Sequence, residues 1–412
     1  MNHQYLKINQ ETEIRFLLYC LGLTEGKNPL AEFEQLPEEN WMAIIERAQT
    51  HKILPLLYYQ LTQFNKDIQI PTSIISQLRR YYLHSSLENT QIFYDLSKIL
   101  REANNNNIPI IILKGAALAE LIYQKIALRP MYDLDLLVKS EDTRRFHELL
   151  LKLGWDCLQS GKLLDYNIAG DYCLGYKKNE LAIDLHTKIE ELPNLNPWIN
   201  AVPVEIDSNN TLVLGPDDLI LYQCTHLYRH INIDFFAELI KFYDIIQVLR
   251  KYKGKSNWDY IIQKSYANQC EHIIHCILSF IKTELGEDVS IDVLNRLKSD
   301  KLAVQISKLL YKNKKLPSIV HDFRPIRNII CRISILLLIP NSVRVTDVIR
   351  YTFNQVFPNK EYMIVRYSIY PTWLFFIYYP VRIIIGGAKV LNVIYKRVSY
   401  SVRNLIHSQD SH

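Results

Sequence analysis

Two aspartates interrupt the apolar run "YDLDLLV", at Asp133 and Asp135. The run has the length and composition of a β-strand, in which residues i and i+2 point to the same face. Both carboxylates are therefore expected side by side, with Leu134 and Leu136 on the opposite face. Neighbouring carboxylates repel each other unless a positive charge neutralises them, and hard oxygen ligands suit Mg²⁺. Acids at a solvent-exposed strand edge, or acids that cap a helix, are the alternatives that this run leaves open.

Two features before this run favour phosphate binding. A short β-branched strand, 108–113, ends at the turn Lys114-Gly115, and a helix is expected over 116–124. A glycine there lets backbone N–H groups approach a phosphate, and the helix adds its positive N-terminus. Arg129, four residues before the first aspartate, is a candidate phosphate ligand through its guanidinium group.

A third isolated acid, Asp184, lies in the apolar stretch "LAIDLHTK", which reads as a further strand. Three carboxylates on neighbouring strands beside a glycine turn are what two-metal phosphoryl chemistry requires. His186 follows on the same strand face, where it would orient the acid or act as a general base. Tyr132 precedes the first aspartate and by the same alternation points away from the acids, so it is predicted to lie in the core.

Two histidines, His226 and His230, are spaced i, i+4 and share one face of a predicted helix. The pattern HxxxH can bind a metal, but the glutamate of H-E-x-x-H is absent. Histidines of the core or of an acceptor pocket are therefore favoured over metal ligands.

The pattern along the chain predicts an α+β fold. Helical periodicity precedes 108, including a helix from Thr72 that stops at the run of asparagines 104–107. A helix over 140–154, capped by Ser140, and two strands around the turn 177–180 belong to a small mixed sheet. We predict four regions: helical 1–107, a small mixed α/β core 108–215, helical 216–315, and a basic, aromatic, mainly helical 316–412.

Composition excludes several classes of protein. Hydrophobic residues make up 48% of the 412 residues and charged ones 22%, as in globular proteins, and the net charge of +5 does not favour nucleic acid as a partner. Seven cysteines without a CxxC pair argue against disulfides and against a cysteine-based zinc site, and indicate a cytoplasmic protein.

The most apolar stretch of the sequence is "YPTWLFFIYYPVRIIIGGAKVL". Prolines and an arginine divide it into pieces too short to cross a bilayer, so no transmembrane segment is expected. Packed helices are favoured there, with peripheral membrane contact or a protein partner of the C-terminal region as alternatives.

Taken together, "ILKGAAL", "RPMYDLDLLV" and "IDLH" resemble the uncharacterised bacterial nucleotidyltransferase family of the DNA polymerase beta-like nucleotidyltransferase superfamily. The likeness spans about 36–250 and includes the later "H-x-x-x-H…D" formed by His226, His230 and Asp244. It implies an enzyme that uses an NTP, such as ATP, and Mg²⁺, with Mn²⁺ as an alternative ion.

The resemblance also implies roles for individual residues. Asp133 and Asp135 would bind two metal ions, and Asp184 would be the third carboxylate, on the metal that activates the acceptor. Lys114, Gly115, Ala116 and Arg129 would surround the triphosphate, and His186, His226 and His230 are candidates for the acceptor side. One departure stands out: the superfamily's Gly-Gly or Gly-Ser turn is here Gly115-Ala116, so the serine hydroxyl is absent, and Lys114 is a candidate to replace it as a phosphate ligand.

These residues predict transfer of a nucleoside monophosphate from an NTP to a hydroxyl of a small-molecule acceptor, or of a protein side chain, with release of pyrophosphate. A catalytically inactive nucleotide-binding or interaction module, either antitoxin-like or a biosynthetic partner, is the alternative. Addition of nucleotides to RNA 3′ ends would require a more basic groove than this sequence offers.

Overall fold

The computed structural model describes residues 10–23, 38–63, 70–123, 125–159, 164–165, 168, 173–234, 238–297, 376 and 378–380. The chain divides into two compact units, and the described residues of 10–159 and 173–297 belong to the larger one. The smaller unit includes the described residues 164–165, 168, 376 and 378–380, which are helical turns. Among the described helices, none is long and apolar enough to cross a membrane. The predicted C-terminal helices lie almost entirely outside the described residues.

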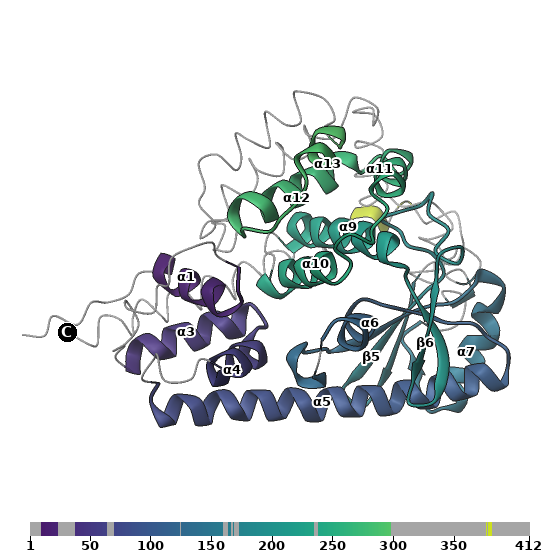
Figure 1. Cartoon of the computed structure of the whole chain (residues 1–412). Helices are drawn as coiled ribbons and strands as arrows, with labels where there is room; N and C mark the ends of the chain where they lie inside the picture. The colour runs from purple at the N-terminus through teal and green to yellow at the C-terminus, as the bar shows by residue number, and fades with distance from the viewer. Residues whose placement is uncertain are drawn as a thin grey trace, which may run out of the picture. The chain divides into compact units, whose positions relative to one another are not determined.

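The centre of the larger unit is a mixed sheet of seven strands, in the order β3-β4-β5-β2-β1-β7-β6 (Figure 1). Pairs β2–β5 and β1–β7 are parallel, and the remaining neighbours are antiparallel. Helices lie on both sides of the sheet, which confirms the predicted α+β class. The strands are β1 Ile111–Leu113, β2 Asp133–Leu137, β3 Asp156–Cys157, β4 Leu174–Lys178, β5 Leu181–His186, β6 Val202–Ile206 and β7 Asn209–Val213.

The register of three central strands brings the isolated acids together. Asp135 of β2 pairs with Asp184 of the parallel strand β5, and with Leu113, the last residue of β1. Leu134 and Leu136 are fully buried on the other face of β2, as the alternation predicts. The end of β1, where the chain enters a helix, therefore lies beside the acids.

The described helices of the larger unit are α1 Gln10–Cys20, α3 Glu38–Thr50, α4 Leu54–Gln63, α5 Thr72–Asn105, α6 Lys114–Leu121, α7 Thr143–Lys152, α9 Pro216–Asp234, α10 Leu239–Lys251, α11 Trp258–Ala267, α12 Glu271–Glu284 and α13 Ile291–Arg296, with short 3-10 helices η1 Ile126–Leu128 and η2 Ser140–Asp142. Helix α5 confirms the predicted stop at the asparagine run. The predicted cap at Ser140 is wrong, because η2 intervenes and α7 begins only at Thr143, after an Asp142 that makes no side-chain capping bond.

The hairpin of β6 and β7 was not predicted from the sequence. Its two-residue turn is Asp207-Ser208, and both residues adopt left-handed conformations, with φ of 47° and 61°. Such turns usually carry glycine, so the strongest sequence signal for a hairpin is absent here.

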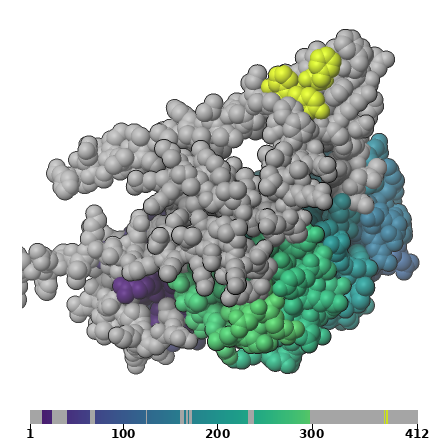
Figure 2. All heavy atoms as spheres, turned by 90° about the horizontal axis from the view of Figure 1, so that it is seen from above, coloured from purple at the N-terminus to yellow at the C-terminus, as the bar shows by residue number. Residues whose placement is uncertain are grey.

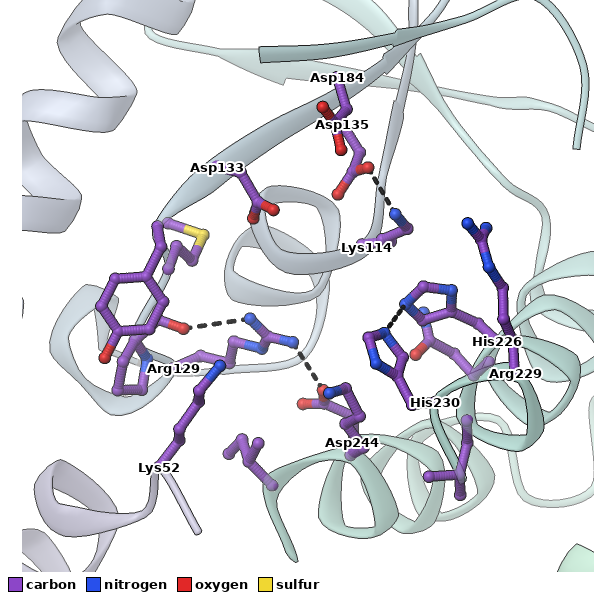
Figure 3. Close-up of a pocket in the computed structure, with 17 residues that line it drawn as sticks. Lys52, Lys114, Arg129, Asp133, Asp135, Asp184, His226, Arg229, His230 and Asp244 are labelled. Carbon is purple, nitrogen blue, oxygen red and sulfur yellow. Dashed lines mark hydrogen bonds and ion pairs between the residues drawn. The ribbon is translucent and has the colours of Figure 1, made fainter. Parts of the chain in front are cut away.

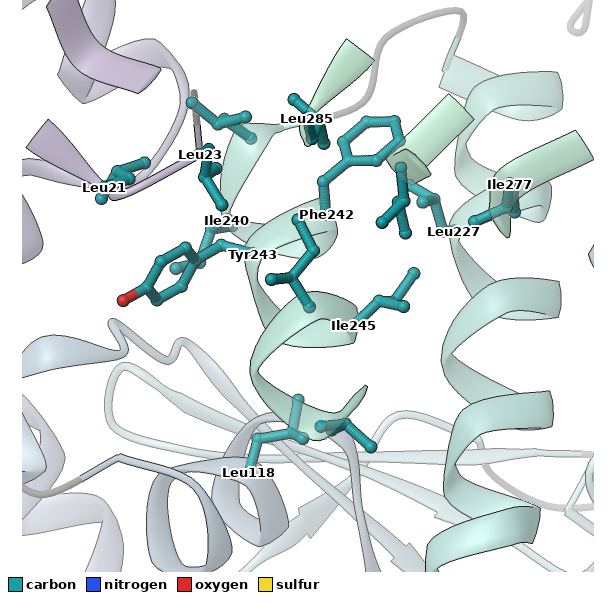
Figure 4. Packing of buried hydrophobic residues seen from close by; sticks show 14 of the residues in the cluster. Leu21, Leu23, Leu118, Leu227, Ile240, Phe242, Tyr243, Ile245, Ile277 and Leu285 are labelled. Carbon is teal, nitrogen blue, oxygen red and sulfur yellow. The ribbon is translucent and has the colours of Figure 1, made fainter. Parts of the chain in front are cut away.

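One hydrophobic core connects the N-terminal helices, the sheet and the C-terminal helices of this unit. Helix α10 lies at its centre: Phe242 and Ile245 pack among Leu23, Leu227 and side chains of α12 (Figure 4). Helices α11–α13 form one continuous block of green spheres in Figure 2. Because α9 and α10 are fixed in this core, the residues that they direct toward the sheet are held in place.

Candidate active site

The three predicted carboxylates line one cavity of about 390 Å³, between the sheet and helices α9 and α10 (Figure 3). Asp133 lies at the exposed start of β2, whereas Asp135 is buried, with 3% of its surface exposed, and Asp184 is half-buried. Burial raises the pKa of Asp133, and the negative charge of Asp135 raises it further. The neighbouring carboxylates thus repel one another, and a cation bound between them would relieve this repulsion.

Asp135 is held by two partners. The Nζ atom of Lys114 lies 2.5 Å from its Oδ1 atom, and the Nε2 atom of His186 lies 3.0 Å from the same oxygen. Burial alone would raise the pKa of Asp135, but the hydrogen bond from His186 and the charge of Lys114 outweigh it and lower this pKa to about 2. Asp135 is therefore ionised at neutral pH and ready to bind a cation.

The turn after β1 differs from the expectation. Lys114, not Gly115, adopts the left-handed conformation, with a φ of 47°. Gly115 is buried in the first turn of α6, where an added Cβ would lie 2.9 Å from the Nη1 atom of Arg129 and 3.2 Å from the Cγ atom of Met131. Glycine thus leaves room for the side chains of Arg129 and Met131 and does not adopt a left-handed turn conformation. Ala116 is also buried in α6, so of this turn Lys114 is the residue that lines the cavity.

Arg129 lines the cavity but is already paired. Its Nη2 atom lies 3.0 Å from Oδ2 of Asp244, and its Nη1 atom donates to the carbonyl oxygen of Pro130 at 3.1 Å. The hydroxyl of Tyr123 donates to the other oxygen of Asp244 at 2.5 Å. Asp244 is 1% exposed, so this is a buried ion pair that joins α10 to the loop before β2. The side chain of Asn89, from α5, also donates to the backbone carbonyl of Arg129 at 2.9 Å.

Two histidines of α9 form the wall opposite the carboxylates. The Nε2 atoms of His226 and His230 are 3.0 Å apart, and Nδ1 of His226 lies 3.3 Å from Oε1 of Glu191. Arg229 donates to the same oxygen at 3.0 Å. Burial lowers the pKa of His226 to about 4, so this ring is neutral at pH 7. A neutral His226 that donates to Glu191 through Nδ1 accepts from His230 through Nε2.

This arrangement has the parts of a phosphoryl-transfer site, namely clustered carboxylates, a lysine and a small-ligand cavity. The family described as "Uncharacterised nucleotidyltransferase" matches residues 37–286, which is more than half of the chain. The chain belongs to this family. It is a nucleotidyltransferase, and the family implies an NTP as a substrate.

The solved structures that match this nucleotidyltransferase are only distantly similar to it. The antibiotic-resistance factor ANT(2'')-Ia is 14% identical, with a TM-score of 0.33, over 44% of this chain and 92% of that one. An antigenic nucleotidyltransferase-like protein from Paracoccidioides brasiliensis is 13% identical, with a TM-score of 0.31, over 52% and 94% of the two chains. No curated protein matches the chain.

Two residues that line the cavity of the nucleotidyltransferase, Tyr132 and Lys52, were not predicted from the sequence to be part of the site. Tyr132, predicted to be a core residue, is 56% exposed at the rim, because β2 begins only at Asp133 and strand alternation does not extend to it. The Nζ atom of Lys52 lies 5.1 Å from the centre of its ring. Lys52 precedes α4, and no local motif connects it with residues 80 positions later.

Proposed function

We propose that this nucleotidyltransferase transfers a nucleoside monophosphate from an NTP to a hydroxyl of a small-molecule acceptor, with release of pyrophosphate, and that it depends on Mg²⁺. One observation carries the proposal: three carboxylates on the paired strands β2 and β5 line the same cavity as Lys114. The cavity volume of about 390 Å³ is in the range of small-ligand sites.

The residues present fit a divalent cation. Asp133, Asp135 and Asp184 offer the hard oxygen ligands that Mg²⁺ prefers. Burial is the main cause of the raised pKa of Asp133, and the charges of Asp135 and Asp184 raise it further, so a bound cation would counter part of this shift. Mg²⁺ bound to these carboxylates would neutralise phosphate charge and lower the pKa of the attacking hydroxyl.

The chain's own groups have separate proposed roles. Asp133 and Asp135 would hold the metal ion, and Asp184 would help to activate the acceptor hydroxyl. Lys114 would bind a phosphate oxygen once the carboxylate of Asp135 is engaged by a cation. The neutral imidazole of His226, on the opposite wall, is a candidate to position the acceptor.

Calorimetric titration with ATP, GTP, CTP and UTP tests the metal dependence of nucleotide binding. Mg²⁺ is expected to raise the affinity for one NTP at least tenfold, and the variant Asp133→Asn/Asp135→Asn is expected to lose this gain, because neutral amides bind Mg²⁺ poorly. Asp156→Asn, at an exposed acid of β3, is the matched control and should keep the gain. Equal affinity with and without Mg²⁺ in the native protein would contradict the proposal.

Tyr132 offers an exposed aromatic face beside the carboxylates and is proposed to stack on the nucleobase. Tyr132→Ala is expected to weaken NTP binding by about 1–3 kcal/mol, the usual contribution of a base stacked on an aromatic ring. Tyr132→Phe is expected to bind like the native protein, since the ring face is kept. Loss of affinity in both variants would instead assign the contribution to the hydroxyl group.

An inactive nucleotide-binding module remains the second candidate function. Buried Ala116 offers no hydroxyl to a phosphate, and this departure from the Gly-Ser turn is the observation that favours it. Metal-dependent NTP binding without release of pyrophosphate, across a panel of hydroxyl-bearing small molecules, would support this candidate over the transferase.

A further inference from the structure

A second group of metal-binding side chains lies next to the carboxylates. Cys173, Asp184 and His186 each place one ligand atom within 4.8 Å of the others. Leu174 of β4 pairs with Leu185 of β5 in antiparallel register, so Cys173 continues this ladder opposite His186. The three side chains therefore come from neighbouring positions, two on β5 and one directly before β4.

The chemistry of this group differs from that of the proposed magnesium site. Mg²⁺ selects oxygen ligands and makes little use of thiolate or imidazole. A thiolate, an imidazole and a carboxylate are instead the protein ligands of Zn²⁺ and of related transition-metal ions. Three protein ligands with a fourth position left open is a common arrangement for such ions.

We propose that Cys173, Asp184 and His186 bind a transition-metal ion such as Zn²⁺, and that this ion inhibits the enzyme. Binding rests on these three side chains alone. Inhibition rests on the proposed function, because an ion held by Cys173 and His186 would withdraw Asp184 from the magnesium carboxylates. The two metals would then compete for one residue, and inhibition would depend on the ratio of Zn²⁺ to Mg²⁺.

The surroundings of the group support such a site. The Nε2 atom of His186 lies 3.0 Å from Oδ1 of Asp135, and a carboxylate beside a metal-binding histidine fixes the orientation of its ring. All three ligands are half-buried, which leaves access for an ion while limiting the competing water. Asp184 and His186 are also fixed on β5, and Cys173 directly precedes β4, to which β5 is paired.

Titration of the full-length protein with Co²⁺, without nucleotide, tests binding by absorption spectroscopy. Co²⁺ substitutes for Zn²⁺ and gives a thiolate-to-metal charge-transfer band when a cysteine is bound. We expect this band to saturate at one Co²⁺ per chain, to disappear when Zn²⁺ is added and to be absent in Cys173→Ser. Cys157→Ser, at another half-buried cysteine of the same sheet, is the matched control and should keep the band. No band in the native protein, or a band that persists in Cys173→Ser, would overturn the site.

Inhibition is measured separately, as the loss of Mg²⁺-dependent pyrophosphate release with increasing Zn²⁺. Cys173→Ser is expected to bind the Mg²⁺–NTP complex like the native protein and to need at least tenfold more Zn²⁺ for the same loss. Equal sensitivity of the two proteins would overturn the inhibition, even if the cobalt band assigns the ligands. If the native protein bound no NTP with Mg²⁺, the proposed function would fail and the inhibition with it, whereas the cobalt spectra would still decide the metal site.

Discussion

Asp184→Asn is expected to lower the rate of nucleotide transfer on the order of 10³-fold, because removing one ligand charge from a metal site costs several kcal/mol in the transition state. The affinity for the Mg²⁺–NTP complex should change much less, since Asp133 and Asp135 remain to bind it. The asparagine keeps the size of the side chain and its place on β5. Pyrophosphate release gives the rate, and calorimetry gives the NTP affinity.

This prediction is specific because Asp184→Asn should lower the transfer rate while leaving the affinity for the Mg²⁺–NTP complex nearly unchanged. Asp156→Asn, the exposed acid on β3, should leave both quantities unchanged. A rate for Asp184→Asn within tenfold of the native value would remove Asp184 from catalysis. A parallel loss of rate and of NTP affinity would instead assign Asp184 to nucleotide binding.

Asp244→Ala is expected to lower the free energy of unfolding by about 3–5 kcal/mol, because it leaves the buried guanidinium of Arg129 without its partner. The Tyr123 hydroxyl loses its acceptor in the same variant. Replacing both charges, as Arg129→Met/Asp244→Leu, should recover most of the loss, since no unpaired buried charge remains. Urea unfolding of the native protein and of these variants gives the values.

A surface pair in the same protein provides the control. Arg296 lies 2.5 Å from Asp259, whose side chain is 81% exposed, so Asp259→Ala should change the free energy of unfolding little. If Asp244→Ala cost no more than Asp259→Ala, the Arg129–Asp244 pair would not stabilise the fold. A double variant less stable than Asp244→Ala would show that the ion pair is needed for more than charge balance.

Local patterns in the sequence predicted the strands that carry the acids. Asp133 and Asp135 stand in an alternating apolar run, and Asp184 stands alone in another, so the strands and the shared face follow from side-chain alternation. Helix α5 and its end at the asparagine run follow from equally local signals. The parallel pairing of β2 with β5 could not be derived in this way, because pairing depends on contacts between distant segments.

The parts of the site that escaped prediction depend on such contacts. Arg129 was read as a phosphate ligand by its proximity to Asp133, but its bond to Asp244 crosses 115 positions. Tyr132 lies one residue outside β2, so the exact strand boundary decides whether it is core or rim. Cys173 gives no signal in a chain without a CxxC pair, and only the β4–β5 register brings it to Asp184 and His186.

The long helix α5 limits where the chain of this enzyme can be truncated or recombined. Asn89, buried at its middle, donates to the backbone carbonyls of Ile126 and Arg129, and Ser97 bonds to Asp207 at the β6–β7 turn. The bonds of Asn89 tie α5 to the loop that precedes the acids, and the bond of Ser97 ties it to the β6–β7 turn. A fragment that begins at Ile108 would lose these anchors. A chimera with other N-terminal helices would therefore have to keep their contacts with this loop and this turn.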